Sequence, residues 1–155
     1  MLACCHWRFV PRSNNNNVAE CYRNLSILYS NREEFDKALT CHEKSLAIQL
    51  QVAGSETSHI VAESYHDIGA VYSLKGDLQK ASDFFQRSLE IRRKTLGNSH
   101  YKVGDTRHSL GKLSESSEKL VDATNSYQEA HDIQRCRLGP HHTKTKESMD
   151  ALARL

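Results

Sequence analysis

A basic or titratable side chain recurs along this chain at intervals of 43 and then 42 residues, as Arg23, His66 and His108. The residues that directly follow them can form hydrogen bonds: Asn24, Asp67 and Ser109. A guanidinium and two imidazoles on one side of a molecule could bind acidic groups, and protonation of the histidines below a pH of about 6.5 would add positive charge. Alternatively, all three side chains lie on a solvated face, and the sequence leaves both interpretations open.

The other reactive side chains do not form a pattern typical of catalysis or of metal binding. Cys4, Cys5 and His6 lack the C-x2-C spacing of a zinc site. Regularly spaced loops carry the histidines His59, His100 and His141-His142. One histidine per loop leaves no four-ligand cage, so we interpret them as loop structure. The chain has no H-E-x-x-H, G-x-x-x-x-G-K-[ST] or G-x-S-x-G motif, and we expect neither an enzyme nor a bound cofactor or metal.

Composition narrows the classes of partner and compartment. The 21 basic and 19 acidic residues give a net charge of +2 and interleave along the chain, so we expect no binding to nucleic acid or to a membrane surface. No apolar run is long enough for a membrane helix, and the N-terminus lacks the apolar core of a signal peptide. Five irregularly spaced cysteines argue against a disulfide framework. These features predict a cytoplasmic protein.

Helix pairs are the elements that would position the recurring side chains. Residues 61–97 display the unit most clearly, and its large and small positions are Tyr65, Ile68, Gly69, Tyr72, Ala81 and Phe85. The three large residues of the first helix share one face, Gly69 and Ala81 let two helices approach closely, and Phe85 fills the space between them. Because such a unit cannot bury its apolar stripe alone, it needs neighbouring copies.

Weaker copies flank this unit, so the repeats are expected at residues 18–60, 61–102 and 103–144, with a closing helix at 145–155. In the first copy His42 takes the place of Phe85, and we interpret it as a core histidine. The third copy has Arg107 and Ser114 in place of tyrosines and no glycine in its turn, so we expect it to be the least stable. Residues 1–17 end in a run of asparagines and are predicted to form a disordered leader.

The spacing of the large and small positions resembles that of the tetratricopeptide repeat. With a period near 42 residues and the loop Leu96-Gly97-Asn98-Ser99-His100, the array is similar to the subclass of kinesin light chains and nephrocystin-like proteins. The resemblance covers residues 18–155 and implies an all-α fold, a right-handed α-solenoid of helix-turn-helix repeats. Kinesin light chains also have a heptad coiled coil that docks on the motor chain, and residues 1–17 contain no heptads.

In this family the first helices of the repeats line a concave groove, and residues offset from the packing positions face it. The resemblance therefore implies a peptide-binding groove formed by Arg23, Asn24, Ile27, His66, Asp67, Ala70, His108, Ser109 and Lys112. Glu20, Glu63 and Asp105 would fall in the first turns of the first helices, where we expect them to complement the helix dipole.

These features together predict a non-catalytic scaffold or adaptor that is similar to kinesin light chains and binds a peptide of a protein partner. The peptide would be extended or a short helix with acidic residues, and its affinity should rise as the pH falls through about 6.5. We expect the protein to be a monomer. The alternative is a structural or regulatory fragment of a longer repeat protein, which self-associates and has no peptide ligand of its own.

Overall fold

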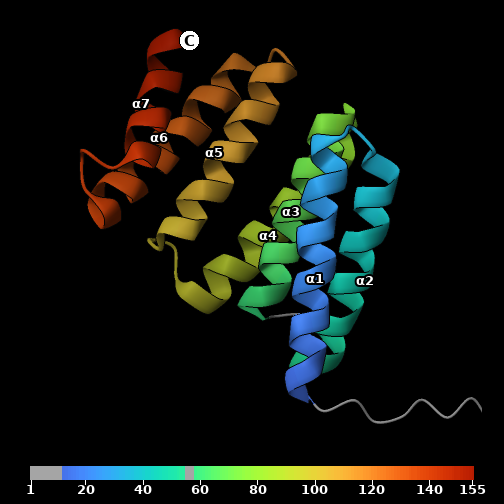
Figure 1. Cartoon of the computed structure of the whole chain (residues 1–155). Helices are drawn as coiled ribbons and strands as arrows, with labels where there is room; N and C mark the ends of the chain where they lie inside the picture. Colours follow the sequence, from blue (N-terminus) through green and yellow to red (C-terminus); the bar gives the residue numbers. More distant parts are fainter. Residues whose placement is uncertain (1–11, 55–57) are drawn as a thin grey trace, which may run out of the picture.

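The computed structural model describes residues 12–54 and 58–155, and folds them into seven α-helices with no strand among these residues (Figure 1). The helices are α1 (Arg12–Asn31), α2 (Phe35–Ala53), α3 (His59–Lys75), α4 (Leu78–Leu96), α5 (Tyr101–Ser116), α6 (Leu120–Leu138) and α7 (Thr143–Arg154). They form three pairs, α1 with α2, α3 with α4 and α5 with α6, which stack in chain order, and α7 packs on α6. The predicted all-α solenoid is confirmed. None of the described helices is long and apolar enough to cross a membrane.

The first and the last helix both begin earlier in the chain than the sequence indicated. Helix α1 starts at Arg12, so residues 12–17, which we expected in a disordered leader, are helical. Asparagine has a low helix propensity, but these residues extend a helix that α2 holds in place, since Ser45 Oγ donates a hydrogen bond of 2.8 Å to the carbonyl of buried Ala19. Residues 1–11, the rest of the expected leader, lie outside the described residues. The closing helix α7 starts at Thr143, two residues before its predicted start.

Within a pair, a small residue of the first helix faces a ring of the second. A Cβ atom placed on Gly69 would lie 3.0 Å from the ring of Phe85, so the backbone of α3 touches that ring directly. Tyr127 lies over the backbone of α5 in the same way. These contacts are the close helix approaches that the repeat pattern predicted.

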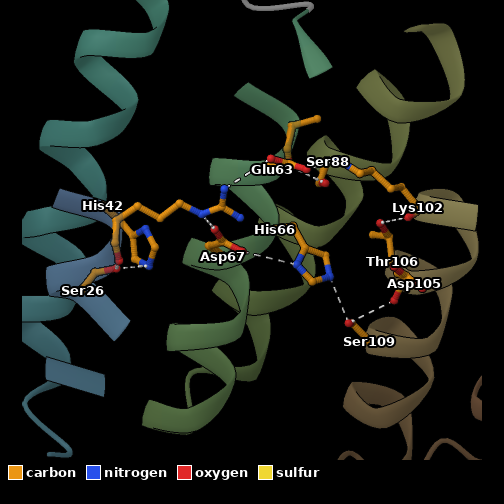
Figure 2. Close-up of polar contacts among 12 residues, drawn as sticks. Ser26, His42, Glu63, His66, Asp67, Ser88, Lys102, Asp105, Thr106 and Ser109 are labelled. Carbon is orange, nitrogen blue, oxygen red and sulfur yellow. Dashed lines mark hydrogen bonds and ion pairs between the residues drawn. The ribbon is translucent and has the colours of Figure 1, made fainter. Parts of the chain in front are cut away.

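The first pair replaces this contact by a hydrogen bond. Ser26 Oγ lies 2.8 Å from His42 Nε2, and both side chains are buried (Figure 2). Because the Ser26 hydroxyl donates to the Arg23 carbonyl at 2.6 Å, His42 Nε2 must carry the hydrogen and donate to Ser26. The other ring nitrogen, Nδ1, has no partner among the described residues. His42 is therefore a core histidine, as the sequence predicted, and burial lowers its pKa.

The turn inside each pair places one residue in the left-handed region. Gly76 occupies this position in the second pair with φ of 87°, whereas Glu33 and Glu118 occupy it in the first and third pairs with φ of 60° and 58°. A residue with a side chain pays about 1–2 kcal/mol in this region, a cost that glycine avoids. The absence of a turn glycine, from which we expected lower stability in the third repeat, therefore has the same backbone cost in the first.

Replacing Glu118 or Glu33 by glycine is expected to stabilise the protein. Each change removes the left-handed cost but gives the unfolded chain more backbone entropy, which leaves a net gain of up to about 1 kcal/mol in the free energy of unfolding. Gly76→Ala is the reciprocal control and should lower that free energy by about 1 kcal/mol or more. Urea unfolding followed by circular dichroism measures all three, and a less stable Glu118→Gly protein would contradict strain at this turn.

The buried histidine of the first pair is expected to make stability depend on pH. Because the pKa of His42 is lower in the folded chain than its ordinary value of about 6.5, the unfolded chain binds the proton first. The free energy of unfolding should therefore fall as the pH drops below about 6.5, until the folded chain is protonated as well. The double substitution Ser26→Gly, His42→Phe copies the contact between Gly69 and Phe85 and should reduce this fall.

Thermal unfolding at pH values between about 5 and 7.5 tests this prediction. The matched control is His42→Phe alone, which should be less stable than the double variant, since the Ser26 side chain would crowd the new ring as a Cβ at position 69 would crowd Phe85. Burial also lowers the pKa of His108, which remains in every variant, so we expect a smaller pH dependence and not its complete loss. A double variant with the wild-type pH profile would contradict a role for His42.

Candidate functional site

The recurring side chains that the sequence singled out reach from one repeat to the next. Arg23 on α1 donates from Nε to Asp67 at 2.7 Å and from Nη1 to Glu63 at 3.3 Å, and both acceptors lie on α3 (Figure 2). His66 on α3 lies 3.1 Å, through Nε2, from the hydroxyl of Ser109 on α5. The structure therefore brings these five residues together as one chain of polar contacts across two junctions between repeats.

The third member of the series makes the same kind of contact. His108 Nδ1 on α5 lies 2.9 Å from Ser148 Oγ on α7. The His108 ring also packs against Tyr127 of its own pair with centroids 5.1 Å apart, and His66 packs against Phe85 at 5.2 Å. Each histidine thus contacts an aromatic ring of its own repeat and a hydroxyl of the unit that follows, on α5 for His66 and on α7 for His108.

Ion pairs between successive first helices run beside these contacts. Lys102 at the start of α5 pairs with Glu63, and Lys144 at the start of α7 pairs with Asp105. Burial alone would raise the pKa of Glu63, but the hydrogen bond and charge of Lys102, together with the charge of Arg23, hold it below its ordinary value. The expectation that Glu20, Glu63 and Asp105 occupy first helical turns was wrong. Helix α1 begins eight residues before Glu20, at Arg12, and α3 and α5 begin four residues before the other two acids, at His59 and Tyr101. Glu63 and Asp105 instead serve to join repeats.

A second set of polar contacts, which the sequence analysis missed, lies buried between the repeats. Gln49 Oε1 on α2 accepts a hydrogen bond of 2.6 Å from Ser64 on α3, and Arg92 Nη1 on α4 donates one of 2.6 Å to Thr106 on α5. Gln134 and Ser148 repeat the contact between α6 and α7 at 2.7 Å. All six side chains are buried.

A signal for this set was present in the sequence. Gln49, Arg92 and Gln134 are spaced by 43 and 42 residues, which is the interval of the repeat itself. Polar residues that recur at the repeat interval within apolar helix faces indicate a shared structural contact. We define the six residues as the junction contacts: Gln49, Ser64, Arg92, Thr106, Gln134 and Ser148.

The loop histidines are used in helix capping. His100 Nδ1 accepts a hydrogen bond of 3.2 Å from the backbone N–H of Lys102, and His142 Nδ1 accepts one of 3.2 Å from Lys144. Ser58 holds the corresponding place before α3. Within residues 12–54 and 58–155, no three histidine, cysteine or acidic side chains come together as a possible metal site. His100 and His142 therefore have a structural role in capping, whereas the expectation of a loop position was wrong for His59, which is the first residue of α3.

The remaining predicted site residues form a stripe that the repeat contacts leave wholly or partly accessible. Ile27, Ala70 and Lys112 occupy equivalent positions of α1, α3 and α5. Ile27 is 50% exposed and Lys112 is also exposed, whereas Ala70 is half-buried against an apolar core cluster. Asn24 is exposed beside Ile27. We call Asn24, Ile27, Ala70 and Lys112 the open stripe. It runs from an apolar residue at the N-terminal end to a positive charge at the C-terminal end.

A hollow on the described surface lies elsewhere. It has a volume of about 440 Å³ and is open to solvent. It is lined by Arg93, Asn98, Ser99, Glu129, Asp132 and Ile133. None of the predicted site residues contributes to it.

Comparison with known proteins identifies the repeats. The sequence profile described as tetratricopeptide repeat matches residues 17–94 and 60–135. No curated protein matches the sequence. Among solved structures, BtubC (BKLC) from P. vanneervenii is similar with a TM-score of 0.78 and 20% identity, over 96% of this chain and 58% of that chain.

Two further structures have the same fold. The nearly identical TPR-like repeats of a kinesin light chain candidate from Podosopora anserina match with a TM-score of 0.78 and 21% identity, over 90% of this chain and 65% of that one. The N-terminal domain of stress-induced protein-1 from C. elegans matches with a TM-score of 0.63 and 14% identity, over 88% of this chain and 96% of that domain. This chain therefore spans less than two thirds of the first two proteins.

The predicted tetratricopeptide repeats are confirmed by the profile match, and the solved structures that share the fold include a kinesin light chain candidate. Repeats of this kind form scaffolds for protein–protein interaction. The chain belongs to the tetratricopeptide repeat family.

Proposed function

We propose that this chain is a non-catalytic adaptor that binds a peptide segment of a protein partner along the open stripe. The observation that carries the proposal is that some polar side chains of the first helices bond to the next repeat while others on the same helices remain exposed. Arg23, His66 and His108 are engaged in contacts between repeats, whereas Ile27 and Lys112 project from the same helices without such contacts among the described residues. A rigid surface with unused side chains at the repeat interval can bind an extended peptide at several points with little ordering cost.

The stripe suggests what the peptide contains. Lys112 would attract an acidic residue, and Ile27 would contact an apolar side chain about two repeats away. The guanidinium of Arg23 already faces two carboxylates, so it offers little net charge to a ligand. Preference for an acidic residue would therefore come mainly from Lys112, a narrower source than the recurring series that the sequence indicated.

The pH dependence expected from His108 is also changed by its surroundings. Burial lowers the pKa of His108, so this side chain gains its charge only below its ordinary range. Any rise in affinity for an acidic peptide that depends on His108 would occur at a pH lower than about 6.5. We place the adaptor in the cytoplasm and in a role similar to that of kinesin light chains, on the basis of the cysteine pattern and the subclass resemblance.

A peptide selected on the protein should lose affinity when the open stripe is changed. The probe is selected from a displayed library of 12-residue peptides that includes acidic sequences. Fluorescence anisotropy then measures the dissociation constant of the selected peptide. Ile27→Asp and Lys112→Glu should each weaken binding about tenfold or more, which corresponds to about 1.4 kcal/mol. Both residues are exposed, so neither change should alter the melting temperature.

The matched control is Lys44→Glu, which makes the same charge change as Lys112→Glu at an exposed site on α2. It should leave the affinity unchanged. Arg23, His66 and His108 are not replaced by alanine, because these side chains join repeats. Their loss would lower the stability of the protein, and a weaker affinity could then not be assigned to the binding surface. If no peptide is selected, or if peptides bind the stripe variants as tightly as the wild type, the proposed function is wrong and the self-associating alternative is favoured.

A further inference from the structure

Helix α1 carries an apolar face of the kind that is buried at each internal junction. Its residues are Val18, Cys21, Leu25 and Leu28, which we call the α1 outer face. Val18, Leu25 and Leu28 are 39%, 38% and 59% exposed. The residues at the same repeat positions of α3, Val61, Ile68 and Val71, are 0%, 2% and 4% exposed because α2 covers them. Of the described helices, only α2 packs extensively on α1, and it leaves Val18, Leu25 and Leu28 exposed.

We propose that the α1 outer face binds the same face of a second copy of this chain, in a symmetric dimer with the two α1 helices antiparallel. The four residues are separated by 3, 4 and 3 positions, the spacing of a coiled-coil seam. This spacing reads the same in both directions. In an antiparallel pair, Val18 therefore lies opposite Leu28 of the second copy, and Cys21 lies opposite Leu25.

The α1 outer face lacks the polar groups with which internal junctions engage a preceding repeat. Where α3, α5 and α7 carry the hydroxyls of the junction contacts, α1 carries Cys21, whose thiol is only a weak hydrogen-bond donor. Where α5 and α7 carry the lysines that pair with a preceding acid, α1 carries Asn17. The α1 outer face therefore has the apolar residues of an internal junction but lacks its polar residues. Such a face is better suited to contact another apolar face than to contact the second helix of a preceding repeat.

One border of the face is free of charge, and the other carries positive charge that would weaken self-pairing at low salt. In a two-fold dimer each residue meets a surface of identical composition, so a charged border would repel itself. Helical spacing places the uncharged Asn17, Asn24 and Asn31 along one border and Tyr22 and Tyr29 along the other. On the tyrosine border, Lys44 and Lys37 of α2 lie over the two rings, 5.5 and 5.6 Å from their centroids, so the dimer should become stronger as salt screens their repulsion. The charged side chains of Glu20 and Arg23 lie further round the helix, with Arg23 turned toward α3.

The dimer should be weak. One helix per copy buries less than the roughly 1,600 Å² of a standard interface. The chain is therefore expected to be monomeric when dilute and dimeric at high concentration, which departs from the sequence-based expectation of a monomer. The contact is independent of the proposed peptide binding, because Ile27 lies on a different side of α1 from the α1 outer face.

Sedimentation equilibrium of the full chain from about 10 µM to about 1 mM tests the dimer under reducing conditions. The wild type should shift from monomer to dimer, and Leu25→Glu, Leu28→Glu should remain monomeric throughout. Val121→Glu is the matched control, since Val121 is an exposed apolar residue on α6, and it should dimerise like the wild type. A wild type that stays monomeric, or a dimer that survives the double substitution, would overturn the proposal.

Disulfide mapping tests the arrangement without a charged substitution. Val18→Cys and Leu28→Cys are introduced together while Cys4, Cys5, Cys21 and Cys136 are changed to serine. Within one helix the two new cysteines are about 15 Å apart and cannot form a bond. On oxidation, mass spectrometry should find residue 18 of one copy linked to residue 28 of the other. Links of 18 to 18 and 28 to 28, or no links, would exclude the antiparallel arrangement.

Discussion

The hydrogen-bonded junction between successive repeats is the constraint on which the rest of this structure depends. A helix pair has an apolar side that only the next pair can cover. At every internal junction that side also buries a hydroxyl, from Ser64, Thr106 or Ser148. A buried hydroxyl without a partner costs about 1–3 kcal/mol, so each needs a side chain of the preceding second helix. This requirement keeps each pair in register with the next and explains why polar residues recur at the repeat interval inside an apolar interface.

The fold could be predicted because its determinants are local. Gly69 and Phe85 lie within one helix pair, and their spacing follows from helix geometry alone, so the sequence indicates the close approach that the structure contains. The start of α1 could not be predicted in this way. The asparagines before Val18 disfavour a helix by propensity, whereas the contact of α2 with Ala19 stabilises one. The outcome depended on tertiary packing that a single stretch of sequence does not contain.

The candidate site was predicted less completely, because position on a helix does not specify the neighbour that a side chain meets. Arg23, His66 and His108 are aligned as the sequence indicated, yet each is oriented toward the following repeat and bonds to it. The direction in which one repeat stacks on another decides this, and only the assembled solenoid defines it. Ile27 and Lys112 lie one helical turn beyond Arg23 and His108, at equivalent positions of the repeat, and both remain exposed.

The sides of the first helices differ in whether their polar groups already have partners within the protein. Polar groups that face a neighbouring repeat are bonded, and their charges are largely neutralised, as with Arg23 between Glu63 and Asp67. Side chains that face neither their own pair nor the next have free capacity for a ligand. On α1 one more side is left, because no preceding pair lies there among the described residues, and it carries apolar groups without polar partners. Ligand binding and self-association would therefore use different sides of one helix, and a dimer would leave the open stripe accessible in both copies.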